Sequence, residues 1–217
     1  MTETVVTLRP ATKKAQREAS VEGLLAAART LFVSRGYTHT TVDEIAEAAS
    51  LTKGAVYFYF RNKEALLAAL LDRVEAIVVD GMTARVADAG PGAAAKLVAF
   101  MHGQAQLGVE RAEDVLLLIL MSLEFAGSGG RVEARIRAIY DELYRAIEAI
   151  IALGKRRGEF RADIRTREQA AIVMALHDGT FLEWYRRRQV LGGPELVRAL
   201  RTSMLAGLLP TPVAEKR

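Results

Sequence analysis

A lysine, a glycine and a tyrosine lie close together in the segment TVDEIAEAASLTKGAVYFYFRNK, residues 41–63. Lys53 and Tyr57 are four residues apart, so on a helix they share one face, with Gly54 beside Lys53. A lysine ammonium can donate to guanine or to phosphate, and a tyrosine can reach a phosphate or a thymine methyl group. A glycine inside a helix costs roughly 1 kcal/mol relative to alanine, but it allows close backbone approach. The three residues favour contact with DNA.

Two threonines add phosphate-binding chemistry to the same segment. Thr41 and Glu44 form a capping box that begins a helix, and Thr52 can cap the next helix. Hydroxyl groups and free backbone N–H groups at helix N-termini favour phosphate oxygens. Taken singly, capping threonines usually only cap, and aromatic residues at helical spacing are usually core. The combination with an exposed lysine and tyrosine is what favours a nucleic-acid surface.

Three helices are expected to position these residues. The first runs from about residue 12 to 35, has a basic leader and ends at Gly36, which suits a left-handed C-terminal cap. Tyr37 can fold back onto it. Two short helices then flank a turn at Ser50 and Leu51, which is a helix-turn-helix arrangement. Residues 1 to about 12 are expected to be a loose tail because Pro10 discourages helix before it.

The remaining chain also has helical periodicity, so the predicted fold is all-α. Asn62 is expected to cap a fourth helix that reaches about Val86, and Gly90-Pro91-Gly92 ends it. Thr166 and Gln169 are expected to form a second capping box. Period-2 alternation of useful strand length is absent. Further helices are expected at about 93–109, 112–125, 131–155, 166–188 and 194–209.

Composition narrows the function classes. The 217 residues carry a net charge of +4 and contain no cysteine, which excludes disulfides, thiolate metal sites and cysteine nucleophiles. The N-terminus lacks a signal-peptide pattern, and the longest apolar run, Val115–Met121, is too short to span a bilayer. A cytoplasmic protein that does not bind membranes is therefore expected.

The segment from Leu24 to Leu70 resembles the N-terminal domain of the TetR family of transcriptional regulators. The matching motifs are LF and RGY around the end of the first helix, TTVDEIA in the second, and TKGAVYFYFRNKEAL across the third and fourth. The resemblance covers about 50 residues and departs at Ser50, where the family generally has glycine. Histidine is often the counterpart of Tyr59.

This resemblance implies a homodimeric regulator, usually a repressor, that binds a palindromic DNA operator and is released by a small effector. It implies a DNA-binding domain at 12–62 and an effector-binding and dimerisation domain at 63–210, in which the last two helices pair across a two-fold axis. Lys53, Gly54 and Tyr57 correspond to positions that contact bases. The positions that commonly touch phosphate correspond to Thr41, Thr52, Tyr59 and Lys63.

The effector is expected to be apolar or amphipathic, because large apolar residues gather around the segment 115–121. Large apolar residues at helical spacing belong to a plain core more often than to a pocket. His102 and His177 lack metal-ligand spacing, so neither a metal nor another cofactor is predicted. The candidate pocket residues are Phe100, Met101, Met121, Phe125, Tyr140, Tyr144, His177, Phe181 and Trp184.

Two other functions remain open: a DNA-binding activator or architectural protein without an effector, and a helical carrier of small molecules. Enzyme activity is not expected, because a Gly-rich phosphate loop, a catalytic triad order and a metal-ligand set are all missing from the sequence. The basic clusters at 131–157 and 186–188 have no assigned role. They suit helical ion pairs, an anion-binding rim or a second phosphate contact.

Overall fold

The computed structural model describes residues 12–210. Within this range the chain is helical and contains no strand, as the sequence predicts. It divides into two compact units between Leu70 and Leu71, which lie inside helix α4 (Lys63–Glu75). The predicted domain boundary at residues 62 and 63 stays a prediction. The tail expected at the N-terminus falls mostly on residues 1–11, outside the described residues.

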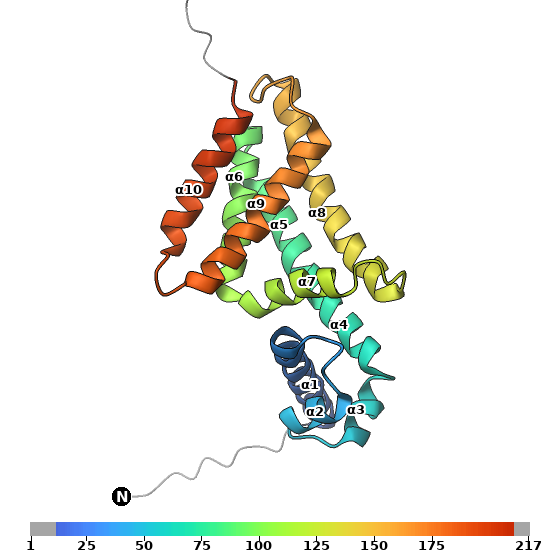
Figure 1. Cartoon of the computed structure of the whole chain (residues 1–217). Helices are drawn as coiled ribbons and strands as arrows, with labels where there is room; N and C mark the ends of the chain where they lie inside the picture. Colours follow the sequence, from blue (N-terminus) through green and yellow to red (C-terminus); the bar gives the residue numbers. More distant parts are fainter. Residues whose placement is uncertain (1–11, 211–217) are drawn as a thin grey trace, which may run out of the picture. The chain divides into compact units, whose positions relative to one another are not determined.

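The first unit contains α1 (Lys13–Arg35), α2 (Val42–Ala48), α3 (Lys53–Tyr59) and the start of α4 (Figure 1). The short helices α2 and α3 each supply few apolar residues, so α1 and α4 provide most of the core. Burial of the aliphatic and aromatic side chains of these helices stabilises the unit. The core includes Leu24, Leu25, Ala28, Phe32, Ile45, Ala46, Val56, Leu66, Leu67 and Leu70.

A side-chain cap begins each of these helices, and the caps of α2, α3 and α4 are those that the sequence predicts. A cap satisfies backbone N–H groups in the first helical turn, which have no partner within the helix. The cap of α2 is a complete capping box, in which Glu44 also accepts from the backbone N–H of Thr41. The capping oxygens belong to Thr12, Thr41, Thr52 and Asn62.

Among residues 12–70, two have left-handed backbone geometry. Gly36 ends α1 with a φ of 82°, and the ring of Tyr37 packs 5.2 Å from that of Phe32, as expected for this cap. Ser50, in the turn between α2 and α3, has a φ of 55°. This conformation is unfavourable for a residue with a Cβ atom, which is why glycine is the usual occupant of such a turn.

The second unit consists of the end of α4, a π-helix η1 (Ala76–Asp80) and helices α5 (Gly81–Asp88), α6 (Ala93–Glu110), α7 (Ala112–Glu124), α8 (Arg131–Arg156), α9 (Thr166–Arg187) and α10 (Gly193–Leu208). α8 packs along α9, and α6 contacts α5, α8, α9 and α10. The segment Val115–Ile119 of α7 is buried, as its uniformly apolar sequence predicts.

The helix expected to reach about Val86 continues to Asp88, but it changes to π geometry at Ala76 and returns to α geometry at Gly81. One local expectation is wrong. The capping box expected at Thr166 is absent, because Thr166 is already the first helical residue and Arg165 precedes the helix without a side-chain cap. None of the helices in residues 12–210 is long and apolar enough to cross a bilayer.

Candidate nucleic-acid interface and ligand cavity

Helix α3 buries one face and exposes the other, as the sequence predicts. Val56 is 1% exposed and faces the core, whereas Tyr57 is 49% exposed. Lys53 and Gly54 are also exposed and lie in the first turn of the same helix. The structure thus brings three predicted DNA-contacting residues together on one surface of a seven-residue helix.

An acidic residue of α2 holds the lysine of this surface. The Nζ atom of Lys53 donates to Oδ2 of Asp43 at 2.8 Å. The hydrogen bond and the charge of Asp43 raise the pKa of Lys53, so the ammonium stays charged. Because both side chains are more than half exposed, water and salt screen the pair, and a phosphate can compete for the lysine.

No steric contact within the described part of the chain requires a glycine at position 54. A Cβ atom placed on it would meet only Oγ1 of Thr52, at 3.8 Å, which is ordinary van der Waals contact. Its φ is not in the left-handed region either. The glycine costs helix stability without any compensating contact inside the protein. The space above Gly54 is open to approach from outside the chain.

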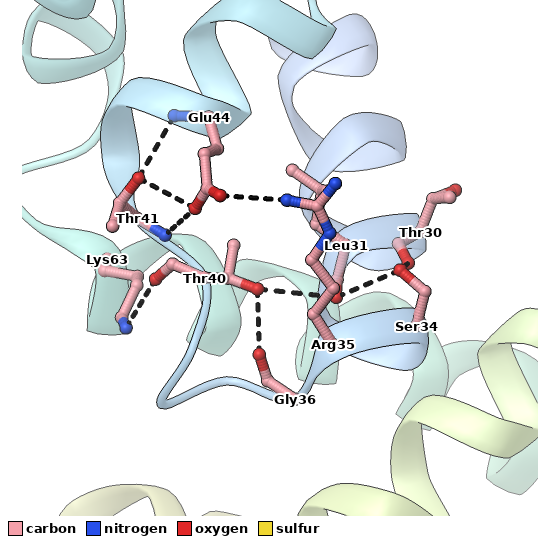
Figure 2. Close-up of polar contacts among 9 residues, drawn as sticks. All are labelled: Thr30, Leu31, Ser34, Arg35, Gly36, Thr40, Thr41, Glu44 and Lys63. Carbon is pink, nitrogen blue, oxygen red and sulfur yellow. Dashed lines mark hydrogen bonds and ion pairs between the residues drawn. The ribbon is translucent and has the colours of Figure 1, made fainter.

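The first turn of α2 contains a network of charged hydrogen bonds around Glu44 (Figure 2). Thr41 donates to Glu44 through its backbone N–H at 2.8 Å and its hydroxyl at 2.9 Å. On the other side, Arg35 donates to Glu44 at 2.8 Å. These bonds lower the pKa of Glu44, with the backbone N–H of Thr41 as the largest cause. The network orients Thr41 at the exposed start of α2.

Lys63 is engaged by the loop between α1 and α2. Its Nζ atom donates to the backbone carbonyl of Tyr37 at 2.7 Å and that of Thr40 at 2.8 Å, and it lies 4.1 Å from the Tyr37 ring centroid. Figure 2 shows the contact with Thr40. Two of the three N–H donors therefore fasten α4 to this loop, which the sequence does not reveal. The phosphate contact of Lys63 stays a prediction.

Sequence reasoning missed Phe58, which is 75% exposed beside Tyr57. Its ring meets that of Tyr59 edge to face at 5.0 Å. Phe58 and Tyr59 also line a shallow hollow against Lys13 and Arg17 of α1. The hollow combines aromatic rings with two cations, a combination that suits a sugar-phosphate backbone. The available signal was the position of Phe58, two residues after buried Val56 and therefore on a different face of the helix.

The second unit contains a cavity of about 430 Å³ between α6, α9 and α10. A volume in this range suits a small organic ligand. Four of the nine predicted pocket residues line it: Met101, His177, Phe181 and Trp184. Close helix packing at one wall depends on Gly108, where a Cβ atom would lie 2.8 Å from the Phe181 ring.

The other five predicted pocket residues lie away from this cavity. Phe100 and Met121 are buried in the core. Tyr140 lies 3.5 Å from Asp178 through its hydroxyl, and burial raises its pKa, as does the Asp178 carboxylate. Asp178 in turn lies 2.8 Å from Nδ1 of His177. The remaining two, Phe125 and Tyr144, are partly exposed.

The cavity also uses residues that the sequence reasoning did not select. α10 contributes a stripe of apolar residues. Their helical spacing indicates a face that is covered by other parts of the protein, but it does not indicate a cavity. α6 contributes Gln104, a buried amide. The additional residues include Gln104, Thr180, Leu196, Val197 and Leu200.

The basic clusters left open by the sequence are largely ion-paired. Arg135 contacts both Asp72 and Glu75 at the end of α4, and these contacts tie α8 to that helix. Arg187 pairs with Glu183 at 3.2 Å. Ordinary helical ion pairs therefore account for much of both clusters. A group of three or more His, Asp or Glu residues placed to hold a metal ion is absent from residues 12–210.

Comparison with known proteins matches the first unit to a described family. Residues 24–70 match the model "Bacterial regulatory proteins, tetR family". The crystal structure of the MbdR regulator from Azoarcus sp. CIB is 48% identical, covers 88% of this chain and 100% of that chain, and has a TM-score of 0.79.

Two more distant proteins are similar over most of the chain. The HTH-type transcriptional repressor BepR of Brucella suis is 25% identical over 173 residues, which are 79% of this chain and 83% of that protein. FadR from Bacillus subtilis, solved in complex with stearoyl-CoA, has the same fold, with a TM-score of 0.71, 22% identity, and coverage of 86% and 98% of the two chains.

Proposed function

Since the chain belongs to the TetR family and is a transcriptional regulator rather than an enzyme, we propose that it is a homodimeric repressor. The repressor binds an inverted-repeat operator and is released by a small apolar or amphipathic effector. Its DNA-binding domain comprises residues 12–62, and residues 63–210 bind the effector and form the dimer. Because its proposed partner is DNA, its proposed location is the cytoplasm.

The exposed face of α3 carries this proposal. Lys53, Gly54 and Tyr57 share a surface, and the space above Gly54 admits a DNA backbone or base edge. Thr41 and Thr52 are exposed and cap neighbouring helix N-termini, whose backbone N–H groups suit phosphate oxygens. The arrangement supports base contacts from α3 and positioning contacts from the two caps and Tyr59.

An exposed apolar stripe on α9 supports the homodimer. Ile172 is 50% exposed and Leu176 is 37% exposed, and the small residues Ala171, Ala175 and Gly179 lie on the same side. Such a stripe is costly in water and suits burial against a second copy. A two-fold dimer would present two α3 helices to half-sites about 34–36 Å apart, which requires an inverted repeat.

The cavity between α6, α9 and α10 supports an effector with a large apolar part. Met101, Phe181 and Trp184 form apolar walls, and Arg198 and Arg201 lie at its margin. An amphipathic molecule can place its tail between the helices and its polar end near the guanidinium groups. The structural relative solved with stearoyl-CoA supports the same general class of ligand.

A mobility-shift experiment on the upstream region of the gene tests the proposal. A regulator binds a discrete inverted repeat, and Lys53→Ala or Tyr57→Ala weakens binding by about tenfold, since a specific contact contributes roughly 1–3 kcal/mol. Arg165→Ala, which removes an exposed positive charge from the second unit, is the matched control. Binding that ignores DNA sequence favours the architectural function, and absence of binding favours the carrier.

A further inference from the structure

Gln104 on α6 is a buried amide in a mainly apolar environment. Only 3% of its surface is exposed, and it lies in the wall of the cavity beside Met101 and Ala105. A buried amide needs partners for its donor and acceptor ends, because leaving either unpaired costs free energy. The partners of the two ends therefore indicate what Gln104 does.

The donor end of Gln104 is occupied by the backbone. Its Nε2 atom donates to the carbonyl oxygen of Val78 at 3.3 Å. Only the nitrogen of an amide can donate to a carbonyl, so this bond also fixes the position of Oε1. No residue between 12 and 210 donates to Oε1. Since every fully buried side-chain oxygen and nitrogen in this range has a partner, Oε1 is not fully buried, and the cavity that Gln104 lines is the space from which a ligand can reach it.

The Val78 carbonyl belongs to the π-helix η1. The next carbonyl, that of Val79, accepts a hydrogen bond from the Thr83 hydroxyl at 2.9 Å. Two successive carbonyls of η1 thus receive side-chain donors. At the adjacent Gly103, a Cβ atom would lie 2.9 Å from Arg85 Cδ, so the Arg85 side chain of α5 passes close to this glycine of α6. π-helical turns inside longer helices are frequent at functional sites.

We propose that Gln104 recognises a hydrogen-bond donor of the effector and links this contact to η1. The inference rests on the proposed effector cavity and specifies its ligand as an apolar molecule with a hydroxyl or amide N–H group. A cationic donor is disfavoured because Arg198 and Arg201 line the cavity. Among residues 12–210, no acidic residue lines it. A ligand donor on Oε1 polarises the amide and strengthens its bond to Val78.

The order of the helices shows which part of the chain η1 adjoins. η1 follows α4 without a break, and the first residues of α4 belong to the unit that carries α3. η1 is thus continuous with the helix that leads into the first unit. Such coupling requires that the ligand bind one arrangement of η1 more tightly than another.

Two isomeric probes test the ligand class. 1-Octanol and heptyl methyl ether contain the same atoms, but only the alcohol has an O–H donor. Trp184 lines the cavity and is the single tryptophan of the chain, so its fluorescence reports binding. We expect the alcohol to bind about three- to tenfold more tightly, which corresponds to one net hydrogen bond. A cavity without an available acceptor would prefer the ether, since its desolvation is less costly.

Two variants test the residue. Gln104→Met keeps similar size but removes both hydrogen-bonding ends, and we expect it to abolish the preference for the alcohol. Met101→Leu, on the same cavity wall, is the control and retains the preference. In the wild-type protein, 1-octanol is also expected to slow hydrogen exchange of amides 76–82, and heptyl methyl ether to have a smaller effect.

Equal affinity for the isomers in the wild-type protein overturns the inference, and this result does not depend on a variant that folds. Persistence of the preference in Gln104→Met also overturns it. Unchanged exchange at 76–82 under saturating alcohol removes the link to η1. If neither isomer binds, the effector cavity fails together with the inference, whereas operator binding in the mobility shift tests the DNA-binding proposal separately.

Discussion

Lys53 of α3 lies 2.8 Å from Asp43 of α2, so the cation proposed to contact DNA already has an anionic partner in the protein. The two residues are ten positions apart and meet because the turn at Ser50 folds the two short helices together. The pair holds the lysine side chain near one geometry before DNA arrives. It also means that the carboxylate competes with DNA for this lysine.

Asp43→Asn should therefore tighten DNA binding. The substitution removes the carboxylate that competes with DNA for Lys53. It also removes a negative charge that would lie near the phosphate backbone. An exposed ion pair contributes at most about 1 kcal/mol, so the gain should be about two- to fivefold in affinity. Mobility shifts at several salt concentrations measure it. Glu47→Gln, an equal charge change on the same helix, should have the smaller effect; an equal gain from both would show a general charge effect.

Gly54→Ala should separate stability from DNA binding. The site has room for a Cβ atom, so alanine should raise the free energy of unfolding by up to about 1 kcal/mol. The added methyl group projects from the proposed DNA-facing surface and should lower operator affinity at least tenfold. Gly23→Ala in α1, where a Cβ atom also meets nothing within 4 Å, is the control and should leave operator affinity unchanged. Retained affinity in Gly54→Ala would remove the reason proposed for this glycine.

Ser50→Gly should stabilise the first unit. Ser50 has a φ of 55°, a conformation that glycine adopts without the steric cost of a Cβ atom. Part of the gain is lost because glycine is more flexible in the unfolded chain, so an increase of about 0.5–1 kcal/mol is expected in denaturant unfolding. Ala48→Gly, inside α2, should instead lower stability by about 1 kcal/mol. Destabilisation by Ser50→Gly would contradict this interpretation of the turn.

Glu44 should make stability depend on acidity. Its hydrogen bonds with Thr41 and its contact with Arg35 lower its pKa, so the folded state favours the carboxylate. This contribution is fully present above the ordinary pKa of about 4.3 and disappears as the pH falls through the lowered value. Glu44→Gln lacks it. The difference in unfolding free energy between wild type and Glu44→Gln should be constant near neutral pH and shrink below about pH 4; growth of that difference on acidification would be incompatible with the network.

Local sequence signals were sufficient for most of the first unit. Thr41, Thr52 and Asn62 predicted the helix starts because capping depends on atoms only three residues away. Helical periodicity separated buried Val56 from exposed Lys53 and Tyr57 for the same reason. Phe58 and Lys63 were harder, since the exposure of one and the carbonyl partners of the other depend on segments elsewhere in the chain.

The sequence by itself determined the helical class, the capped helices around α3 and the family motifs, because neighbouring residues set these features. Only the tertiary structure decided which apolar residues surround a cavity: Met101, Trp184 and Leu196 lie on three helices and meet through packing. It also decided that Gln104 lies against the π-helix η1. Periodicity shows which side of a helix is apolar, but the partner of that side depends on contacts between residues far apart in the chain.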